Sequence, residues 1–270
     1  MTQAIYEPKG KAREYAPLAC NLYSGCTHGC TYCYAPACLH RNPKDFHAAG
    51  VPRPGILVAL AKDADRLIER SNVQGTFVIQ PVLFCFSCDP YQQAEETERI
   101  TRQAVGELGE RRIPIRVLTK NPQLALRDLD LFKKYGVEFG VSCVWSTAER
   151  AAEWEPNANT PSQRQAAIRI AKRAGVYTWV SVEPVVDPAE ALDAIRTLAP
   201  DVDKFKVGPL NHRKAPTPVD WTKFLRDALT LLEGLRSSYY IKDDLWAHAD
   251  QEILDRWPKT WERRSGMGQG

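Results

Sequence analysis

The chain has 270 residues, 44% of them hydrophobic and 26% charged, which is ordinary for a globular protein with a sizeable buried core. The net charge of +3 is too small to indicate nucleic-acid binding by itself. No apolar run approaches the roughly 20 residues that a membrane-spanning helix needs, and the start of the chain has no apolar core of the secretory kind. We therefore expect a cytoplasmic protein without a membrane partner.

The first informative segment is rich in cysteine. Five of the eight cysteines lie within nineteen residues, and in a reducing compartment such crowding favours metal binding or catalysis over disulfides. The segment reads NLYSGCTHGCTYCYAP, so that its central cysteines are Cys26, Cys30 and Cys33. Gly25 and Gly29 allow the backbone to wrap closely around a bound group.

Strand-like and helix-like stretches alternate along the rest of the chain. The pattern predicts strands over 55–60, 76–88, 115–120, 137–145, 176–185 and 203–210, and helices over 62–71, 91–109, 122–134, 161–174, 188–198 and 218–235. The segment SYYIKD, from residue 238, is a candidate last strand. This alternation predicts an α/β fold, a partial (β/α)6-type TIM barrel with a C-terminal extension. We place the barrel in residues 1–215, with the cysteine loop at 20–38, and a helix and tail packed on it in residues 216–270.

Polar residues recur where the predicted strands end, which is the face on which such barrels carry their chemistry. They are Ser87, Cys88 and Asp89, then Thr119 and Lys120, Ser142 and Cys143, Glu183, and finally Asn211 and His212. Each by itself is compatible with a turn or a helix cap. Their recurrence predicts a site at this face.

The spacing Cys26-x3-Cys30-x2-Cys33 fits a cubane iron–sulfur cluster. Such a cluster takes one thiolate per iron, so three cysteines leave one iron open to a further ligand. Zinc bound by Cys30, Cys33, Cys85 and Cys88 is a rival, although residues three apart on a strand point to opposite faces. Two other rivals are a set of plain buried cysteines and a cluster closed by Cys38 as a fourth ligand.

The three cysteines, with Tyr32 before the last one, resemble the signature of the radical S-adenosylmethionine (SAM) superfamily. The longer stretches EYAPLACNLYSGCTHGCTYCYAP, CFSCDPYQQAEE, VLTKNP and ERAAEWEPNANTPSQRQAAIRIAKRAGV resemble its spore photoproduct lyase-like branch. The resemblance covers roughly residues 5–210. It implies a [4Fe–4S] cluster on Cys26, Cys30 and Cys33, SAM on its open iron, and an external one-electron reductant.

The resemblance also implies roles for single residues. It assigns Tyr32, Asp89, Lys120, Ser142 and Glu183 to cofactor binding. Asp89 would accept from the SAM ammonium, Lys120 would pair with its carboxylate, and Ser142 and Glu183 would face the carboxylate, ribose or substrate. Lyases of this branch return hydrogen through a cysteine, which makes Cys85 and Cys88 the candidate catalytic residues, although they do not align cleanly with the lyase pattern.

The branch acts on thymine-derived nucleotides in DNA, and short relatives resemble phage enzymes that hypermodify thymidine. We therefore expect a radical SAM enzyme, an isomerase or a lyase, acting on a modified pyrimidine in DNA, with the isomerase favoured because the chain is short and the donor cysteine is displaced. The alternatives are photoproduct repair and a non-catalytic iron–sulfur protein that binds nucleic acid. A basic, aromatic tail with Trp257, Lys259, Trp261, Arg263 and Arg264 fits a nucleic-acid partner or a packed chain end.

Overall fold

The computed structural model describes residues 3–74, 78–211 and 216–258. In these residues eight strands form one curved sheet in the order β1-β2-β5-β6-β7-β8-β9-β10, and β3 pairs with β4 outside it. All neighbours in the large sheet are parallel except β1 and β2. The strands are β1 (Ile5–Tyr6), β2 (Leu18–Cys20), β3 (Tyr23–Ser24), β4 (Val51–Pro52), β5 (Val82–Phe84), β6 (Ile115–Thr119), β7 (Glu138–Ser142), β8 (Thr178–Val185), β9 (Lys204–Pro209) and β10 (Ser238–Ile241).

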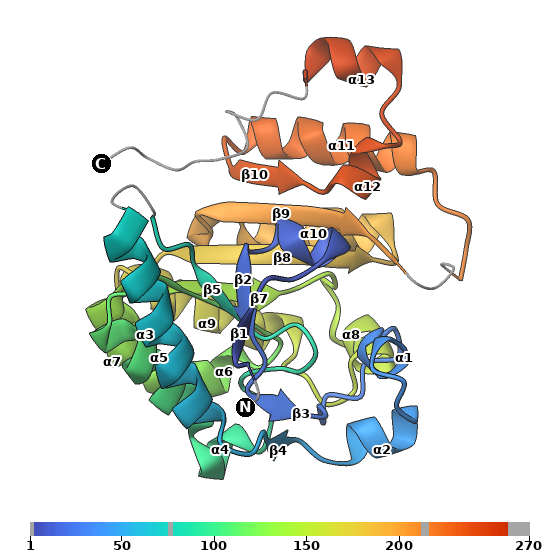
Figure 1. The fold of residues 1–270 in the computed structure, drawn as a ribbon. Coiled ribbons are helices and arrows are strands. Elements are labelled where there is room, and N and C mark those ends of the chain that lie inside the picture. The colour runs from blue at the N-terminus through green and yellow to red at the C-terminus, as the bar shows by residue number, and fades with distance from the viewer. Residues whose placement is uncertain (1–2, 75–77, 212–215, 259–270) are drawn as a thin grey trace.

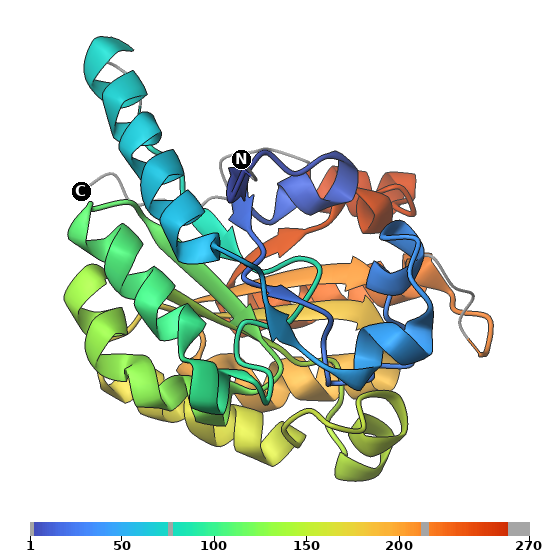
Figure 2. The same ribbon diagram turned by 60° about the horizontal axis from the view of Figure 1, so that its bottom comes forward.

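Helices cover the outer, convex face of the sheet (Figures 1 and 2). The long ones are α3 (Ile56–Gln74), α5 (Ile100–Glu110), α9 (Pro161–Arg173), α10 (Pro188–Leu198) and α11 (Trp221–Gly234). Shorter helices are η1 (Gly10–Glu14), α1 (Ala35–Cys38), α2 (Pro43–Ala48), α4 (Glu95–Glu98), α6 (Pro122–Ala125), η2 (Leu126–Asp128), α7 (Leu129–Tyr135), α8 (Ala148–Trp154), η3 (Ala199–Asp201), α12 (Asp243–Trp246) and α13 (Gln251–Arg256). None of the described helices has both the length and the apolar character needed to cross a bilayer.

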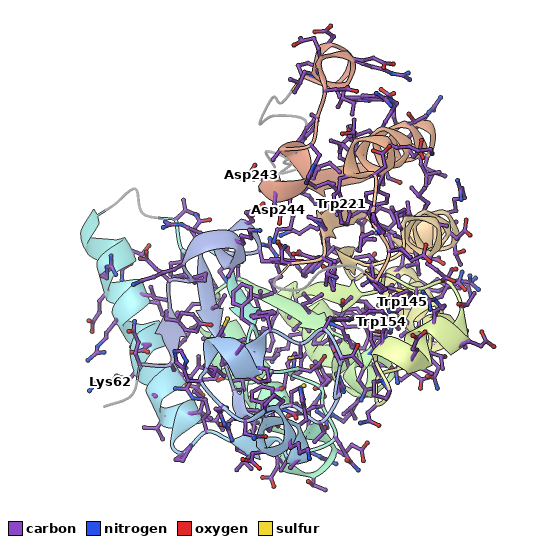
Figure 3. All side chains as sticks on the ribbon, turned by 90° about the vertical axis from the view of Figure 1, so that its right-hand side faces the viewer. Lys62, Trp145, Trp154, Trp221, Asp243 and Asp244 are labelled. Carbon is purple, nitrogen blue, oxygen red and sulfur yellow. The ribbon has the colours of Figure 1, made fainter. Side chains whose placement is uncertain are left out.

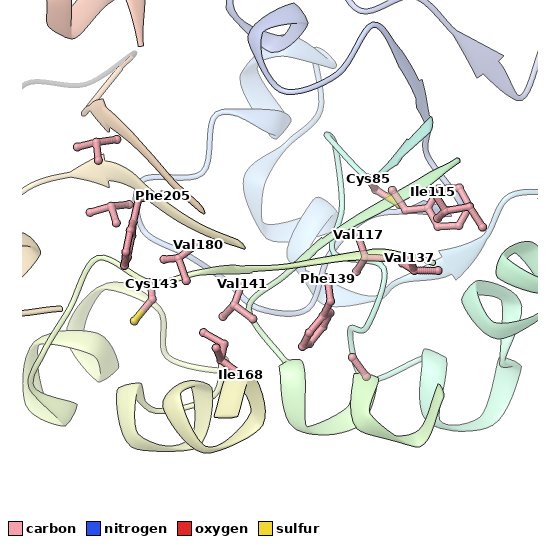
Figure 4. Packing of buried hydrophobic residues seen from close by; sticks show 14 of the residues in the cluster. Cys85, Ile115, Val117, Val137, Phe139, Val141, Cys143, Ile168, Val180 and Phe205 are labelled. Atoms are coloured by element: carbon pink, nitrogen blue, oxygen red, sulfur yellow. The ribbon is translucent and has the colours of Figure 1, made fainter. Parts of the chain in front are cut away.

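Two separate sets of side chains pack on the two faces of the sheet. On the outer face Val117, Phe139 and Val141 pack with α9 through Ile168 in the main core (Figure 4). The inner face carries a smaller cluster of Tyr15, Ala16, Leu83 and Trp179, with Phe86 and Leu118 against it. Because strand residues alternate between faces, these two sets define the outside and the inside of a partial barrel. The predicted α/β partial barrel is confirmed.

The N-terminal segment lies beside the last strands of the sheet, at its open side (Figure 2). Glu14 on η1 accepts hydrogen bonds from Tyr240 Oη (2.9 Å) and from the backbone N–H of Asp243 (3.0 Å). Beneath it, buried Lys206 donates to the carbonyl of Tyr15 (3.0 Å), and Arg116 donates to the same carbonyl from β6 (2.5 Å). The segment therefore links the two ends of a sheet that does not close.

Four predicted elements were wrong in type or extent. Residues 56–60 belong to helix α3, because Ile56 and Leu60 bury one helical face while Val58 is 77% exposed. Of the strand expected over 76–88, the described residues 78–88 contain only β5, and residues after Phe84 form a loop; residues 76 and 77 lie outside the described residues. The helix expected over 91–109 is divided into α4 and α5 at Arg99, which has a left-handed backbone.

The helix expected over 122–134 is divided into α6, η2 and α7. The remaining predicted strands and helices are present, with ends that differ by a few residues. The boundary expected at residue 215 stays a prediction, although β10 extends the sheet beyond it by pairing with β9. In the expected tail, Trp257 is 5% exposed and belongs to the main core, so it offers no stacking surface. Lys259, Trp261, Arg263 and Arg264, like His212, lie outside the described residues.

Candidate active site

The three motif cysteines lie on one loop between β3 and α1. Cys26 is buried and packs with Ala35 and Phe46, and Cys33 lies against the same group. The backbone of α2 holds the loop from outside, since Cys26 N–H donates to the Phe46 carbonyl (3.1 Å) and His47 Nδ1 lies 2.8 Å from the Cys26 carbonyl oxygen. The loop that carries the three cysteines is thus packed against α1 and α2, and the use of these cysteines as cluster ligands stays a prediction at this point.

The chemistry of this thiol group suits a soft metal centre. Burial raises the pKa of Cys26 to about 12 and also raises the pKa of Cys30, to which Cys26 and Cys33 contribute electrostatically. A bound metal displaces such protons and stabilises the thiolates. Cys38, in contrast, is exposed at the end of α1, so it does not stand with the three cysteines as a fourth ligand.

The zinc alternative finds no support. Among the described residues, no three His, Cys, Asp or Glu side chains converge on a position suited to one metal ion. A cubane does not need such convergence, because each thiolate binds a different iron. The expectation that Cys85 and Cys88 point to opposite faces of one strand was wrong. Both lie in the loop after β5, where their side chains hydrogen-bond to each other.

Asp89 connects the cysteine loop to strand β6. Its buried carboxylate accepts from Tyr91 N–H (2.8 Å), Thr119 Oγ1 (2.7 Å) and Lys120 N–H (2.7 Å), and His28 Nε2 lies 3.1 Å away. Burial alone would raise the pKa of Asp89, but the charge and hydrogen bond of His28, then the bonds from Lys120 and Thr119, lower it to about 2. Asp89 thus anchors the loop after β5 to β6 through three hydrogen bonds, and its contact with the SAM ammonium stays a prediction.

Lys120 and Tyr32 meet beside Cys30. The Lys120 ammonium lies over the Tyr32 ring, 5.6 Å from its centroid, and Tyr32 Oη donates to the buried carboxylate of Glu155. Burial lowers the pKa of Lys120, but Cys30 and Glu155 outweigh it and raise the pKa overall. The site therefore holds a half-buried cation next to the cysteine loop, where it can meet an anionic ligand.

Ser142 and Glu183 line the same end of the sheet. The Ser142 hydroxyl donates to the Glu183 carbonyl (3.4 Å), and the Glu183 carboxylate accepts from Lys242 Nζ (3.1 Å) and from Tyr15 Oη. Tyr15 Oη also bonds Ser181 Oγ (2.7 Å). Sequence reasoning missed Tyr15 and Lys242, because only the fold brings residues 15 and 242 together.

The two candidate catalytic cysteines lie in different surroundings. Cys85 is buried in the main core (Figure 4), with its Sγ accepting from Leu22 N–H (3.5 Å). Cys88 packs beside Cys26. Neither belongs to the inner cluster that contains Tyr15 and Trp179. Their use as hydrogen donors stays a prediction to which this placement gives no support.

Comparison with known proteins decides the family. The sequence profile described as the radical SAM superfamily matches residues 20–199, which is two thirds of the chain. This protein belongs to the radical SAM superfamily. It is accordingly a radical SAM enzyme that uses a [4Fe–4S] cluster and SAM, and the three cysteines, one per iron, fit that cluster.

The curated relatives of this radical SAM enzyme are longer proteins. An uncharacterized protein of Methanocaldococcus jannaschii is 25% identical over 173 residues, covering 63% of this chain and 61% of the relative. An uncharacterized protein of Mycobacterium tuberculosis is 30% identical over 187 residues, covering 65% of this chain and 52% of the relative. The chain thus spans about half to three fifths of the length of these relatives.

Solved structures support the fold. Spore photoproduct lyase, in a mutant with bound AdoMet and dinucleoside spore photoproduct, superposes with a TM-score of 0.68 at 16% identity, covering 87% of this chain and 78% of that one. Streptococcus suis SuiB bound to the precursor peptide SuiA gives a TM-score of 0.62 at 11% identity, covering 85% of this chain and 49% of that one. At these identities the likeness concerns the fold of the radical SAM barrel.

Proposed function

We propose that this radical SAM enzyme acts on a modified thymidine or another pyrimidine in DNA, as an isomerase in thymidine hypermodification. Supporting observations are the radical SAM profile over residues 20–199 and the fold shared with spore photoproduct lyase; of the candidate donor thiols, Cys85 is buried in the main core and Cys88 packs beside the motif cysteine Cys26. A lyase that returns hydrogen through a thiol needs one near the substrate. An isomerase can return the abstracted hydrogen atom to its own product and needs no such thiol.

In this proposal, the residues near the carboxyl ends of the strands have separate roles. Cys26, Cys30 and Cys33 hold the cluster, and Lys120 pairs with the SAM carboxylate. A reduced cluster held by these cysteines would supply the one-electron chemistry that cleaves SAM and starts a radical reaction on the substrate. Ser142 and Glu183 are polar residues near the carboxyl ends of β7 and β8, and the Glu183 carboxylate accepts hydrogen bonds from Tyr15 and Lys242.

A polyanionic substrate is supported by the exposed surface of η1 and its flank. Lys9, Lys11 and Arg13 are exposed there, and Lys11 forms an ion pair with Asp244 (3.0 Å) and donates a hydrogen bond to Asn211 Oδ1. Basic side chains in such a place can bind phosphates and position a strand over the site. Among structurally similar proteins, spore photoproduct lyase carries a dinucleoside ligand, whereas SuiB carries a peptide.

The test is mass spectrometry of nucleosides from DNA incubated with anaerobically reconstituted enzyme, SAM and a one-electron reductant. Conversion of a modified thymidine to an isomer of unchanged mass, with SAM not consumed stoichiometrically, is the expected result. Repair of spore photoproduct to thymines would identify a lyase instead. A bound cluster that yields no 5′-deoxyadenosine would indicate a non-catalytic iron–sulfur protein, and conversion of peptides alone would overturn the nucleotide proposal.

A further inference from the structure

The segment Trp154–Asn157, which joins α8 to α9, forms an outer support for the cysteine loop. The carbonyl of Trp154 accepts from Thr31 N–H (2.9 Å), and Asn157 Nδ2 donates to the Thr27 carbonyl (2.9 Å). The N–H of Asn157 also donates to the His28 carbonyl (3.3 Å). The support therefore contacts the loop on both sides of Cys30.

Glu155 is the charged centre of this support. Its side chain is fully buried, accepts from Tyr32 Oη and forms an ion pair with the fully buried side chain of Arg164. Arg164 also donates to the carbonyls of Ser142 (2.8 Å) and Asn159 (2.8 Å). A buried charge is costly unless it is paired and hydrogen-bonded, so this network has little freedom to rearrange.

Tyr32 connects the network to the site. Its ring stacks on Trp154 with centroids 6.4 Å apart, and Trp154 stacks in turn on Trp145 at 5.8 Å (Figure 3). The Lys120 ammonium lies over the same Tyr32 ring. The ring and hydroxyl of Tyr32 are thus fixed by separate contacts, and Tyr32 lies between two cluster cysteines in the sequence.

We infer that Glu155 is a positioning residue, which through Tyr32 holds the Cys30–Cys33 segment and the Lys120 ammonium in the arrangement that binds the cluster and SAM. The inference concerns the superfamily cofactors and does not depend on the proposed DNA substrate. It differs from a purely structural role, in which the Glu155–Arg164 pair would only fasten α9 to β7. The two roles predict different effects at the cluster.

The experiment compares Tyr32→Phe and Glu155→Gln with the wild type. Tyr32→Phe removes only the hydroxyl that reaches Glu155 and retains the ring. Glu190→Gln is the matched control. The Glu190 carboxylate accepts hydrogen bonds from Ser146 and Thr147 in the loop after β7, and it does not contact the cysteine loop. The measurements are iron and sulfide content, the electron paramagnetic resonance spectrum of the reduced cluster with and without SAM, and the Kd for SAM.

Both site variants are expected to weaken SAM binding about tenfold, equivalent to about 1.4 kcal/mol, and to change the SAM-induced shift of the spectrum. The double variant should bind SAM only slightly more weakly than the weaker-binding single variant, because both substitutions remove the same hydrogen bond between Tyr32 and Glu155. Glu190→Gln should match the wild type in each cluster measurement.

Wild-type spectra and SAM affinity within twofold in both variants would overturn the inference, even if thermal stability fell. If Glu155→Gln does not fold, because Arg164 is left buried without its carboxylate, Tyr32→Phe decides alone. Since no substrate is used, failure here leaves the proposed function standing, and failure of that function leaves this result unaffected.

Discussion

Gly25, the residue before the first cluster cysteine, offers the sharpest test of how the loop is built. Its φ is +81°, and a Cβ built on it would lie 2.1 Å from the Ala49 carbonyl oxygen and 2.8 Å from that of Phe46. Both obstacles are backbone atoms at the end of α2, where Phe46 also accepts from Cys26 N–H. Gly25→Ala therefore has to separate the cysteine loop from α2.

The magnitude follows from two contributions. A side chain in the left-handed region costs roughly 1–2 kcal/mol, and overpacking against unyielding neighbours costs about 1–3 kcal/mol more. Gly175, after α9, is the matched reference, because its φ is +82° and nothing lies within 4 Å of its added Cβ. We expect Gly175→Ala to lower the free energy of unfolding by the first contribution alone. Gly25→Ala should lower it by both contributions together, about 2–5 kcal/mol.

The assay is urea unfolding of the cluster-free, reduced chains, followed by iron content after reconstitution. Gly25→Ala should be the less stable variant by about 1–3 kcal/mol and should retain little iron, while Gly175→Ala retains the wild-type content. Equal stability of the two variants within about 0.5 kcal/mol, together with full iron content in both, would refute this explanation of the loop.

Three further predictions concern the surroundings of the loop. The pKa of Asp89 is about 2, below its ordinary value, so Asp89 stabilises the fold above about pH 4, and roughly 2 kcal/mol is lost as the pH falls toward 2. In Asp89→Asn, the free energy of unfolding should fall less steeply between about pH 4 and pH 2. The same pH dependence as in the wild type would contradict the lowered pKa of Asp89. Lys120→Met retains an apolar chain next to Tyr32 but removes the ammonium, so SAM binding measured by calorimetry should weaken at least about tenfold. Wild-type affinity would show that Lys120 does not bind SAM. Gly140→Ala should cost about 1–3 kcal/mol in urea unfolding, because its Cβ would lie 2.2 Å from Trp179 inside the barrel; a neutral result would mean that Trp179 moves freely.

The sequence predicted those features that depend on local pattern. The Cys26, Cys30 and Cys33 spacing implied the cluster and the family, and strand–helix alternation implied the barrel. Helix α9 was found from Pro161, which follows the capping Thr160, because capping residues lie next to the helix they begin. Strand ends such as Lys120 and Glu183 were found because parallel strands place their carboxyl ends on one edge.

Features that depend on tertiary contacts escaped prediction. Residues 55–60 look like a strand by composition, and only burial of Ile56 and Leu60 against the core shows a helix. Glu155 and Arg164 pair across a loop, and their charges give no local sign that both are fully buried.

The measurement that tests the central claim most directly is formation of 5′-deoxyadenosine. Anaerobically reconstituted protein, reduced and supplied with SAM, should produce it, and Cys30→Ala should produce none and retain little iron. A wild-type protein with full iron and sulfide content that leaves SAM intact under reduction would contradict the claim that Cys26, Cys30 and Cys33 hold a cluster that cleaves SAM.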